Sequence, residues 1–274
     1  MPAINTNTAA NSAVRYLNIN SSQETSSLSK LSSGSRITSA SDDAAGLAIS
    51  TRISSDVTTL QQAATNASQA TAILQTADGG ASNISDILAR MKSLASESAS
   101  GTTTDSSRAY INSEFTQLTS EIDSIASGTR YSSQSLLDGS SVFASGVSVL
   151  VGSSGSDTIT ITLTSLTASS LGVSSLDVST LSDATSALTT LDTAIDTVSA
   201  ARASIGAQES RFNFSADSIS TQTQNLQSAN SAIEDVDIAA EQSKLSSAEV
   251  KTQAAVSALA AANQMPQYLL KLLG

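Results

Sequence analysis

The sequence predicts a mainly α-helical protein, a long coiled-coil or helical-bundle rod with paired N- and C-terminal helices and a small β-hairpin region. Three observations predict this fold class. The only prolines are Pro2 and Pro266, so residues 3–265 contain no obligatory helix breaker. Apolar residues recur by threes and fours along several long stretches. Aromatic residues make up 3% of the 274 residues and hydrophobic residues 39%, so small aliphatic side chains must build the core.

The N-terminal segment, residues 1–41, is expected to form a terminal helix with a thin apolar seam. Its heptad register is kept by Val14, Leu17, Leu28 and Leu31, but the intervening slots fall on Ser21 and Glu24. Such a seam buries too little apolar surface to offset roughly 1 to 2 kcal/mol per residue of backbone ordering. We therefore expect this end to become fully helical only when something covers it.

Residues 42–234 are expected to form a second domain, which begins with three helices. The first, at about 42–78, starts at the capping candidates Asp42 and Asp43 and ends at Gly79-Gly80. The second is expected at about 81–100. The third, at about 105–127, stops at Gly128. Each has an apolar face, so the helices can pack as a bundle.

A change of apolar period from about 3.5 to 2 predicts a β-hairpin region at residues 131–163. The alternating residues are Val147, Val149 and Val151, followed by Ile159, Ile161 and Leu163. Turns are expected at Asp138-Gly139 and from Gly152 to Asp157. The Ser/Thr/Leu-rich residues 164–180 are interpreted as a loop that returns to the next helix.

The longest predicted helix spans residues 181–233. Its seam comprises Leu181, Ala184, Leu188, Leu191, Ile195, Val198, Arg202, Ile205, Glu209, Phe212, Ala216, Ile219, Thr223, Leu226, Asn230 and Ile233. These 53 positions would span roughly 80 Å at 1.5 Å per residue. A compact globule of this chain length is only roughly 50 Å across, so we expect an elongated molecule. The polar seam residues Arg202, Glu209 and Asn230 fit a role in fixing helix register better than an active site.

The C-terminal segment, residues 235–274, carries a seam as thin as that of the N-terminus. Ile238, Leu245, Thr252 and Leu259 recur every seven residues, with Ala248 and Val256 close to the other seam positions. We expect the two ends to pair as one domain and to use Val14, Leu17, Leu28, Leu31, Ile238, Leu245, Val256 and Leu259 for assembly. Incompletely covered ends favour contacts between different surfaces of two copies, which generate an open filament when they do not close.

Composition argues against most other functions. The chain has no Cys and no His, so imidazole bases, thiolate nucleophiles and the usual zinc and haem sites are missing, and we expect neither an enzyme nor a cofactor. A net charge of −11 disfavours nucleic acid, and no apolar stretch is long enough for membrane insertion. Ser27-x-x-Lys30 resembles an acyl-enzyme spacing, but serine is so common here that chance explains it better. The acidic group of Glu234, Asp235, Asp237 and Glu241 fits a helix joint better than a cation site.

Both ends of the chain resemble bacterial flagellin. The N-terminal motifs are Ile4-Asn5-Thr6-Asn7, the stretch from Leu28 to Gly34 with Arg36-Ile37, and Ala-Ser-Asp-Asp-Ala-Ala-Gly-Leu-Ala at Ala40 to Ala48. The C-terminal motifs are Ser231 to Asp237, Ala260 to Gln267, and Leu272-Leu273. The resemblance covers about residues 1–137 and 181–274. Large variable outer domains cannot fit in the short remainder, so the chain resembles a compact flagellin.

The resemblance implies a structural subunit of the bacterial flagellar filament, secreted unfolded by flagellar type III export and located outside the cell. The implied partners are copies of itself, an export chaperone, the filament cap and hook-associated proteins. In the family the paired ends line the inner filament core, and the neighbouring helices form the surrounding rod domain. Two alternatives remain open at this point, a hook–filament junction protein and a signalling coiled coil.

Some flagellins are also recognised by Toll-like receptor 5 through the first rod-domain helices. The family motif maps onto Leu88 to Ala95 and Glu114, and Arg90, Leu94 and Glu114 match it. Ala89, Lys92 and Ser93 depart from it at the centre, which argues against receptor activation. A contact between protofilaments is the other role implied for this surface.

Overall fold

The computed structural model describes residues 6–273, with side chains described up to residue 268. Ile4 and Asn5 of the first flagellin-like motif lie outside this range, as do the side chains of Leu272 and Leu273. The chain divides into two compact units. The terminal unit comprises the residues up to Ser55 and from Asn225 onward, and the middle unit comprises Asp56–Gln224.

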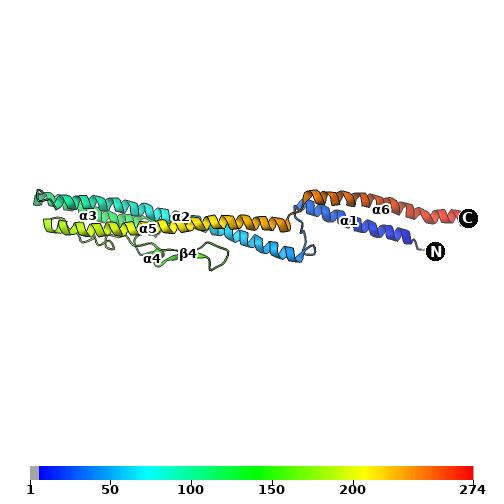
Figure 1. The fold of residues 1–274 in the computed structure, drawn as a ribbon, viewed down its shortest axis with the longest axis horizontal. Helices are drawn as coiled ribbons and strands as arrows, with labels where there is room; N and C mark the ends of the chain where they lie inside the picture. Colours follow the sequence, from blue (N-terminus) through cyan, green and yellow to red (C-terminus); the bar gives the residue numbers. More distant parts are fainter. Residues whose placement is uncertain (1–5, 274) are drawn as a thin grey trace. The chain divides into compact units, whose positions relative to one another are not determined.

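Two long helices from opposite ends of the chain form most of the terminal unit. Helix α1 (Thr8–Ser33) begins at Asn7, whose side chain accepts a hydrogen bond from the Ala10 amide, and ends at Gly34 in the left-handed conformation. Helix α6 (Ile238–Leu273) begins after Asp237, whose carboxylate accepts from the Ala240 amide. They lie side by side and antiparallel (Figure 1). The predicted pairing of the terminal helices is therefore confirmed.

The segments that leave this helix pair are tied together by backbone hydrogen bonds. Ser35 and Asp235 form an antiparallel β-bridge, and the Val236 amide donates to the Gly34 carbonyl at 3.0 Å. The Arg36 guanidinium donates to the Ile233 carbonyl at 2.6 Å. Ile233 lies in the last turn of the helix that precedes α6, so Arg36 satisfies a carbonyl that this helix leaves free at its end. These bonds fix the segment that follows α1 against the segment that precedes α6.

The middle unit is a bundle built on α2 (Ala44–Ser98), α3 (Asp105–Gly128) and α5 (Leu181–Glu234). Ion pairs from Asp78 to Arg202 and from Lys92 to Asp192 join α2 to α5 and show that these two helices run antiparallel. On α5, every seventh residue from Ala184 to Ile219 is buried, namely Ala184, Leu191, Val198, Ile205, Phe212 and Ile219. This half of the predicted seam is confirmed. In the other half Leu181 is exposed and Leu188, Ile195, Arg202 and Glu209 are only half-buried, whereas Ala187, Ala194, Ala201 and Gln208 beside them are buried.

The predicted helix end at Gly79-Gly80 is wrong, because α2 continues through both glycines to Ser98. A Cβ on Gly80 would lie 2.4 Å from the Thr129 side chain and 2.9 Å from that of Leu137, whereas one on Gly79 would meet nothing within 4 Å. Gly80 thus allows the segment after α3 to approach the helix closely. The adjoining buried residues Ala77 and Ala81 anchor the helix on both sides of the glycines, so packing overrides their poor helix propensity.

The β region consists of two small antiparallel pairs with a short helix between them. Strands β1 (Arg130–Tyr131) and β2 (Gln134–Ser135) are joined by Ser132 and Ser133, both at positive φ. After α4 (Val142–Ser145), β3 (Val147–Leu150) pairs with β4 (Thr158–Ile161), with Val147 opposite Ile161 and Val149 opposite Ile159. The turn predicted from Gly152 to Asp157 joins β3 to β4, whereas Asp138-Gly139 joins no pair of strands.

The core of the middle unit lies among these helices, the strands and the segment that follows them. Residues 164–180 form no helix or strand, as predicted, yet they are packed against the bundle. Leu166, Ala168, Val173 and Val178 are fully buried. Backbone amides of the segment donate to α3 side chains, from Ala168 to Asp123 and from Val178 to Asn112.

Candidate assembly surface

The contact between α1 and α6 has a small apolar seam. Leu245, Ala248, Ala255 and Ala262 of α6 are buried, and Leu17 and Leu31 of α1 are half-buried. Three of these four buried apolar residues are alanines, which bury little apolar area. The pair therefore gains less from burial than the middle unit, whose core contains Leu, Ile and Phe.

The predicted assembly residues fall into two groups. Leu17, Leu31, Leu245 and Leu259 lie within the contact between α1 and α6, where they are buried or half-buried. Val14, Leu28, Ile238 and Val256 are exposed, with exposed fractions of 40%, 58%, 64% and 52%. The heptad seam of α1 runs through Ala10, Ala13, Leu17, Asn20, Glu24, Ser27 and Leu31. Because several of these are polar, the apolar pattern alone did not identify them.

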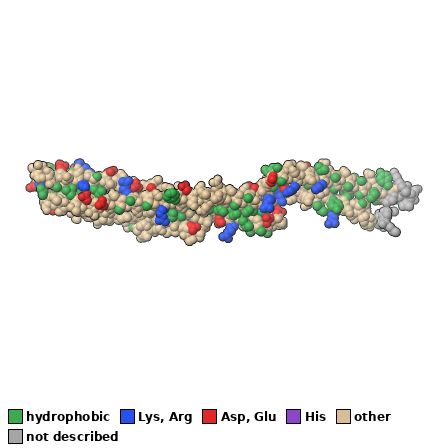
Figure 2. All heavy atoms as spheres, viewed as in Figure 1, with side chains coloured by type: hydrophobic (Ala, Val, Ile, Leu, Met, Phe, Trp, Pro, Cys, Tyr) green, Lys and Arg blue, Asp and Glu red, His purple; other side chains and the backbone are tan. Residues whose placement is uncertain are grey.

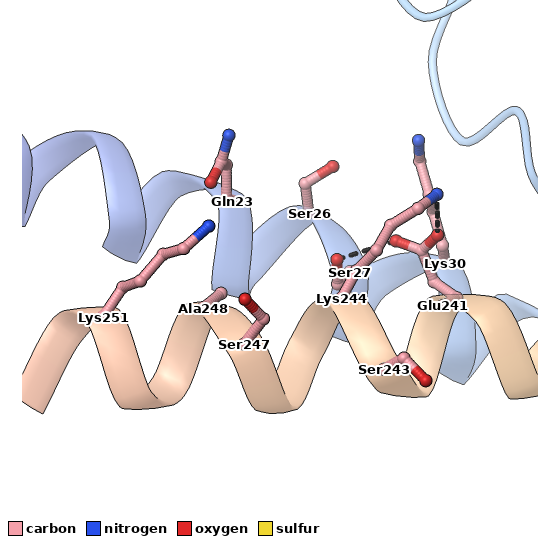
Figure 3. A pocket seen from close by; sticks show the side chains of 10 residues that line it. All are labelled: Gln23, Ser26, Ser27, Lys30, Glu241, Ser243, Lys244, Ser247, Ala248 and Lys251. Carbon is pink, nitrogen blue, oxygen red and sulfur yellow. Dashed lines mark hydrogen bonds and ion pairs between the residues drawn. The ribbon is translucent and has the colours of Figure 1, made fainter.

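A buried carboxylate, that of Glu241, lies against the Ser27 end of this seam. The Glu241 side chain accepts a hydrogen bond from the Ser27 hydroxyl at 2.7 Å and one from the Lys244 ammonium at 2.8 Å (Figure 3). These hydrogen bonds, the one from Lys244 first, lower the pKa of Glu241 below its ordinary value of 4.5 against the opposing effect of burial. Glu241 is thus a charged and fully engaged contact between the two ends of the chain.

A groove of about 500 Å³ opens beside this carboxylate, along one side of the helix pair (Figure 3). It is lined by Gln23, Ser26, Ser27 and Lys30 of α1 and by Glu241, Ser243, Lys244, Ser247, Ala248 and Lys251 of α6. Three of the chain's five lysines line this groove. We call it the lysine groove.

The helix pair also exposes large apolar side chains to solvent. On α1 these are Val14, Tyr16, Ile19 and Leu28, and on α6 they are Ile238, Val250, Val256, Met265 and Tyr268. Figure 2 shows apolar side chains at the surface over this pair. An array of exposed apolar side chains along two adjacent helices is typical of a surface that other protein covers.

The possible acyl-enzyme pair and the acidic group noted in the sequence both have structural roles. The Ser27 hydroxyl donates to Glu241 and so is not activated as a nucleophile by Lys30. Glu234 accepts hydrogen bonds from Ser50 and Asn230, and Asp235 lies in the linker, as expected for a helix joint. Within the described part of the chain, no three acidic side chains gather as metal ligands would. Nor does any described helix combine the length and apolarity of a membrane span.

The three residues of the receptor motif do not form one surface. Arg90 on α2 donates to Glu114 on α3 at 2.7 Å, and both side chains are about half exposed. Leu94 is only 2% exposed and belongs to the core. Leu94 therefore cannot touch a partner without opening the bundle.

Comparisons with known proteins match flagellins at both ends of the chain and over nearly its whole length. Residues 4–142 match the bacterial flagellin N-terminal helical region, and residues 188–273 match the bacterial flagellin C-terminal helical region. A flagellin of Halalkalibacterium halodurans is 36% identical over 98% of this chain and 99% of its own length. A flagellar filament 30.7 kDa core protein of Treponema maltophilum is 34% identical, with the same coverage of both chains.

A solved structure agrees with them. The crystal structure of Bacillus cereus flagellin matches with a TM-score of 0.52 and 29% identity, over 61% of this chain and 94% of that one. The relatives named here are flagellins and a filament core protein, which favours a filament subunit over a junction protein or a signalling coiled coil. The chain belongs to the bacterial flagellin family, the structural subunits of the extracellular flagellar filament.

Proposed function

We propose that the α1–α6 pair is the part of this flagellin through which copies polymerise, and that it becomes fully ordered only on polymerisation. The observation that carries this proposal is the contrast between the two sides of each helix. The inward side combines a few leucines with alanines and polar residues, whereas Val14, Leu28, Ile238 and Val256 face solvent. Neighbouring copies that cover these side chains would supply the burial that the isolated pair lacks.

The domain assignment is part of the same proposal. Residues 1–41 and 235–274 would line the inner core of the filament, and residues 42–234 would form the rod domain around it. The extensive apolar core of the middle unit supports a rod domain that is stable before assembly. The role is mechanical, and no catalytic activity is assigned to the chain.

Further partners follow from this role. An export chaperone would bind the subunit before export. The filament cap and hook-associated proteins would contact it at the two ends of the filament. The exposed ion pair of Arg90 and Glu114 is assigned to a contact between protofilaments. Receptor recognition is not assigned to it, because Leu94 is buried and Ala89, Lys92 and Ser93 depart from the family motif.

Two truncations test the proposal. Chains lacking residues 1–30 or residues 245–274 should remain folded and soluble, because the core of the middle unit is intact in both. Neither should form filaments when seeded, whereas the full chain should. Electron microscopy and sedimentation report the outcome. Filaments formed by either truncated chain would show that terminal pairing is not the polymerising contact.

A further inference from the structure

The lysine groove carries more positive charge than the residues within it can balance. Glu241 is its only acidic side chain, and that carboxylate already accepts from Lys244. Among the described residues, the ammonium groups of Lys30 and Lys251 have no carboxylate within 4.0 Å. In a chain with a net charge of −11, this groove is a local excess of positive charge that lacks a partner.

The lining of the groove suits a carboxylate. Lys30, Lys244 and Lys251 supply ammonium donors from two helices, and the hydroxyls of Ser26 and Ser247 supply neutral donors. The Ser243 hydroxyl already donates to the Ala239 carbonyl. The backbone amides around the groove are engaged within α1 and α6, so they form no cradle of the kind that binds phosphate. The available donors are side-chain ammonium and hydroxyl groups, and these can bind the carboxylate of a side chain from another molecule.

One acidic side chain of the helix pair is available to reach into such a groove. Helices α1 and α6 carry three acidic residues, Glu24, Glu241 and Glu249. Glu24 is half-buried and accepts from Thr252, and Glu241 is buried. Glu249 is exposed, and its carboxylate has no ion pair or hydrogen bond among the described side chains.

Glu249 does not lie on the side of the helix that faces the groove. At about 100° per residue, Glu249 is about 140° from Lys244 around α6, and Ile238 and Val256 are each about 120° from it in the same direction. On α1, Val14 and Leu28 are each about 160° from Lys30. The helix pair thus presents the lysine groove on one side, and Glu249 with Val14, Leu28, Ile238 and Val256 on the other. The exposed Tyr16 and Ile19 lie within about 40° of Lys30, on the groove side.

We propose that the lysine groove receives the Glu249 carboxylate of a second copy of this chain, so that opposite sides of the helix pair meet in a head-to-tail contact. The inference rests on the proposed polymerisation and assigns one of its contacts. A contact between two different surfaces leaves one groove and one Glu249 free at the ends of any row of copies. Such a row can extend without closing, as a filament requires.

Charge reversal tests the contact in the full-length chain. Lys251→Glu places an acid in the groove, and Glu249→Lys gives the opposite side a positive charge. Each variant alone should raise the critical concentration for filament growth at low salt by about fivefold or more. Lys251→Glu cancels the net positive charge of the groove, and Glu249→Lys brings two positive surfaces together. The effect should shrink as salt screens the charges. Lys251→Arg, which keeps the charge, should assemble like the unmodified chain.

Restoring the complementary charges should restore growth. The double variant Lys251→Glu with Glu249→Lys should assemble at a lower concentration than Glu249→Lys alone, because the new ammonium group then meets the new carboxylate of the groove. An equimolar mixture of the two single variants should co-assemble, because each groove then meets an opposite charge on the next copy. Both positions are exposed, so circular dichroism of the unassembled variants should match that of the unmodified chain.

The possible outcomes separate the two proposals. If neither single variant changes growth, the groove contact is wrong and the polymerising role of the helix pair stands. If both single variants fail and neither the double variant nor the mixture recovers, Glu249 is not the occupant of the groove. If the unmodified chain forms no filaments from seeds, the proposed function itself is overturned.

Discussion

Glu241 links the two ends of the chain through a charge that is both buried and fully engaged. Ser27 on α1 and Lys244 on α6 donate to the same carboxyl group, and their combined effect lowers its pKa. A buried acid with these donors stabilises the helix pair only while it is ionised. The serine that resembles a nucleophile in the sequence is therefore a structural partner of this acid.

We predict that the α1–α6 pair loses stability in acid. Because the folded pKa of Glu241 lies below 4.5, its contribution is present above pH 4.5 and is lost as the pH falls through the folded value. Glu241→Gln should cost about 1 kcal/mol at neutral pH, and the difference should vanish in acid. Hydrogen exchange of the α6 amides near Leu245 in assembled protein checks this. Equal protection of both proteins at neutral pH would contradict it.

Glu209 shows the opposite behaviour in the middle unit. Burial and the nearby charge of Asp78 raise the pKa of Glu209, and its buried Oε1 has no hydrogen-bond partner among the described atoms. Asp78 is itself paired with Arg202, whose pKa it raises through a hydrogen bond. A carboxylate in this position is destabilising when it is charged.

We predict that Glu209→Gln stabilises the middle unit by about 0.5 to 1 kcal/mol at pH 7, because it removes a poorly solvated charge. Since the folded pKa is raised, the unmodified protein should gain stability as the pH falls through that value, and the difference should then close. Urea unfolding at pH 7 and in acid measures both effects. A variant that is less stable at neutral pH would indicate a partner for Glu209.

Helix α2 shows how far a local stop signal can be overridden. The sequence predicts an end at Gly79-Gly80, but the two glycines differ in their surroundings. Gly80 lies under Thr129 and Leu137, and Gly79 faces open space. This difference depends on residues about fifty positions further along the chain, so a local pattern could not reveal it.

The two glycines form a matched pair of mutations. Gly79→Ala should stabilise the chain by about 0.5 to 1 kcal/mol, because alanine has the better helix propensity. Gly80→Ala should destabilise it by about 1 to 3 kcal/mol, because the new methyl group would overlap Thr129. Thermal unfolding monitored by circular dichroism compares them. Stabilisation by Gly80→Ala would show that the segment after α3 can move away at little cost.

The β region and the segment that follows it were predicted only where the sequence has a regular apolar period. The alternation of Val147, Val149, Ile159 and Ile161 predicted the β3–β4 pair because side-chain period reports directly on a half-buried strand. The β1–β2 turn was not predicted, because it places Ser132 and Ser133 at positive φ, where glycine is the usual signal. The burial of residues 164–180 was also missed, since irregular backbone has no period to detect.

At the scale of the whole molecule, the sequence predicted the pairing of the ends but only some of the residues that form it. Leu17, Leu31, Leu245 and Leu259 were assigned to one set with Val14, Leu28, Ile238 and Val256, and the structure separates the two groups. The reason is that Asn20, Glu24 and Ser27 occupy the contact in place of apolar residues. The lysine groove was not expected either, because its residues come from both ends of the chain.

Coupled ordering predicts a change in helix content. The free subunit should have less helix by circular dichroism than the polymer, because the α1–α6 pair has a thin seam and exposes apolar side chains. The chain lacking residues 245–274 is the control, since it should show no gain under polymerising conditions. Equal helicity of free subunit and polymer would refute the coupling.

The pairing of α1 with α6 also governs when the subunit can be completed. The Asn7 side chain donates to the carbonyl of Ala262, a contact that spans 255 positions of the sequence. During synthesis, or during passage through any narrow conduit, the end that emerges first must wait for nearly the whole chain before it meets its partner. A chain that is only partly synthesised or partly exported therefore lacks the paired α1–α6 surface, and it cannot polymerise through that surface before the C-terminal helix has emerged.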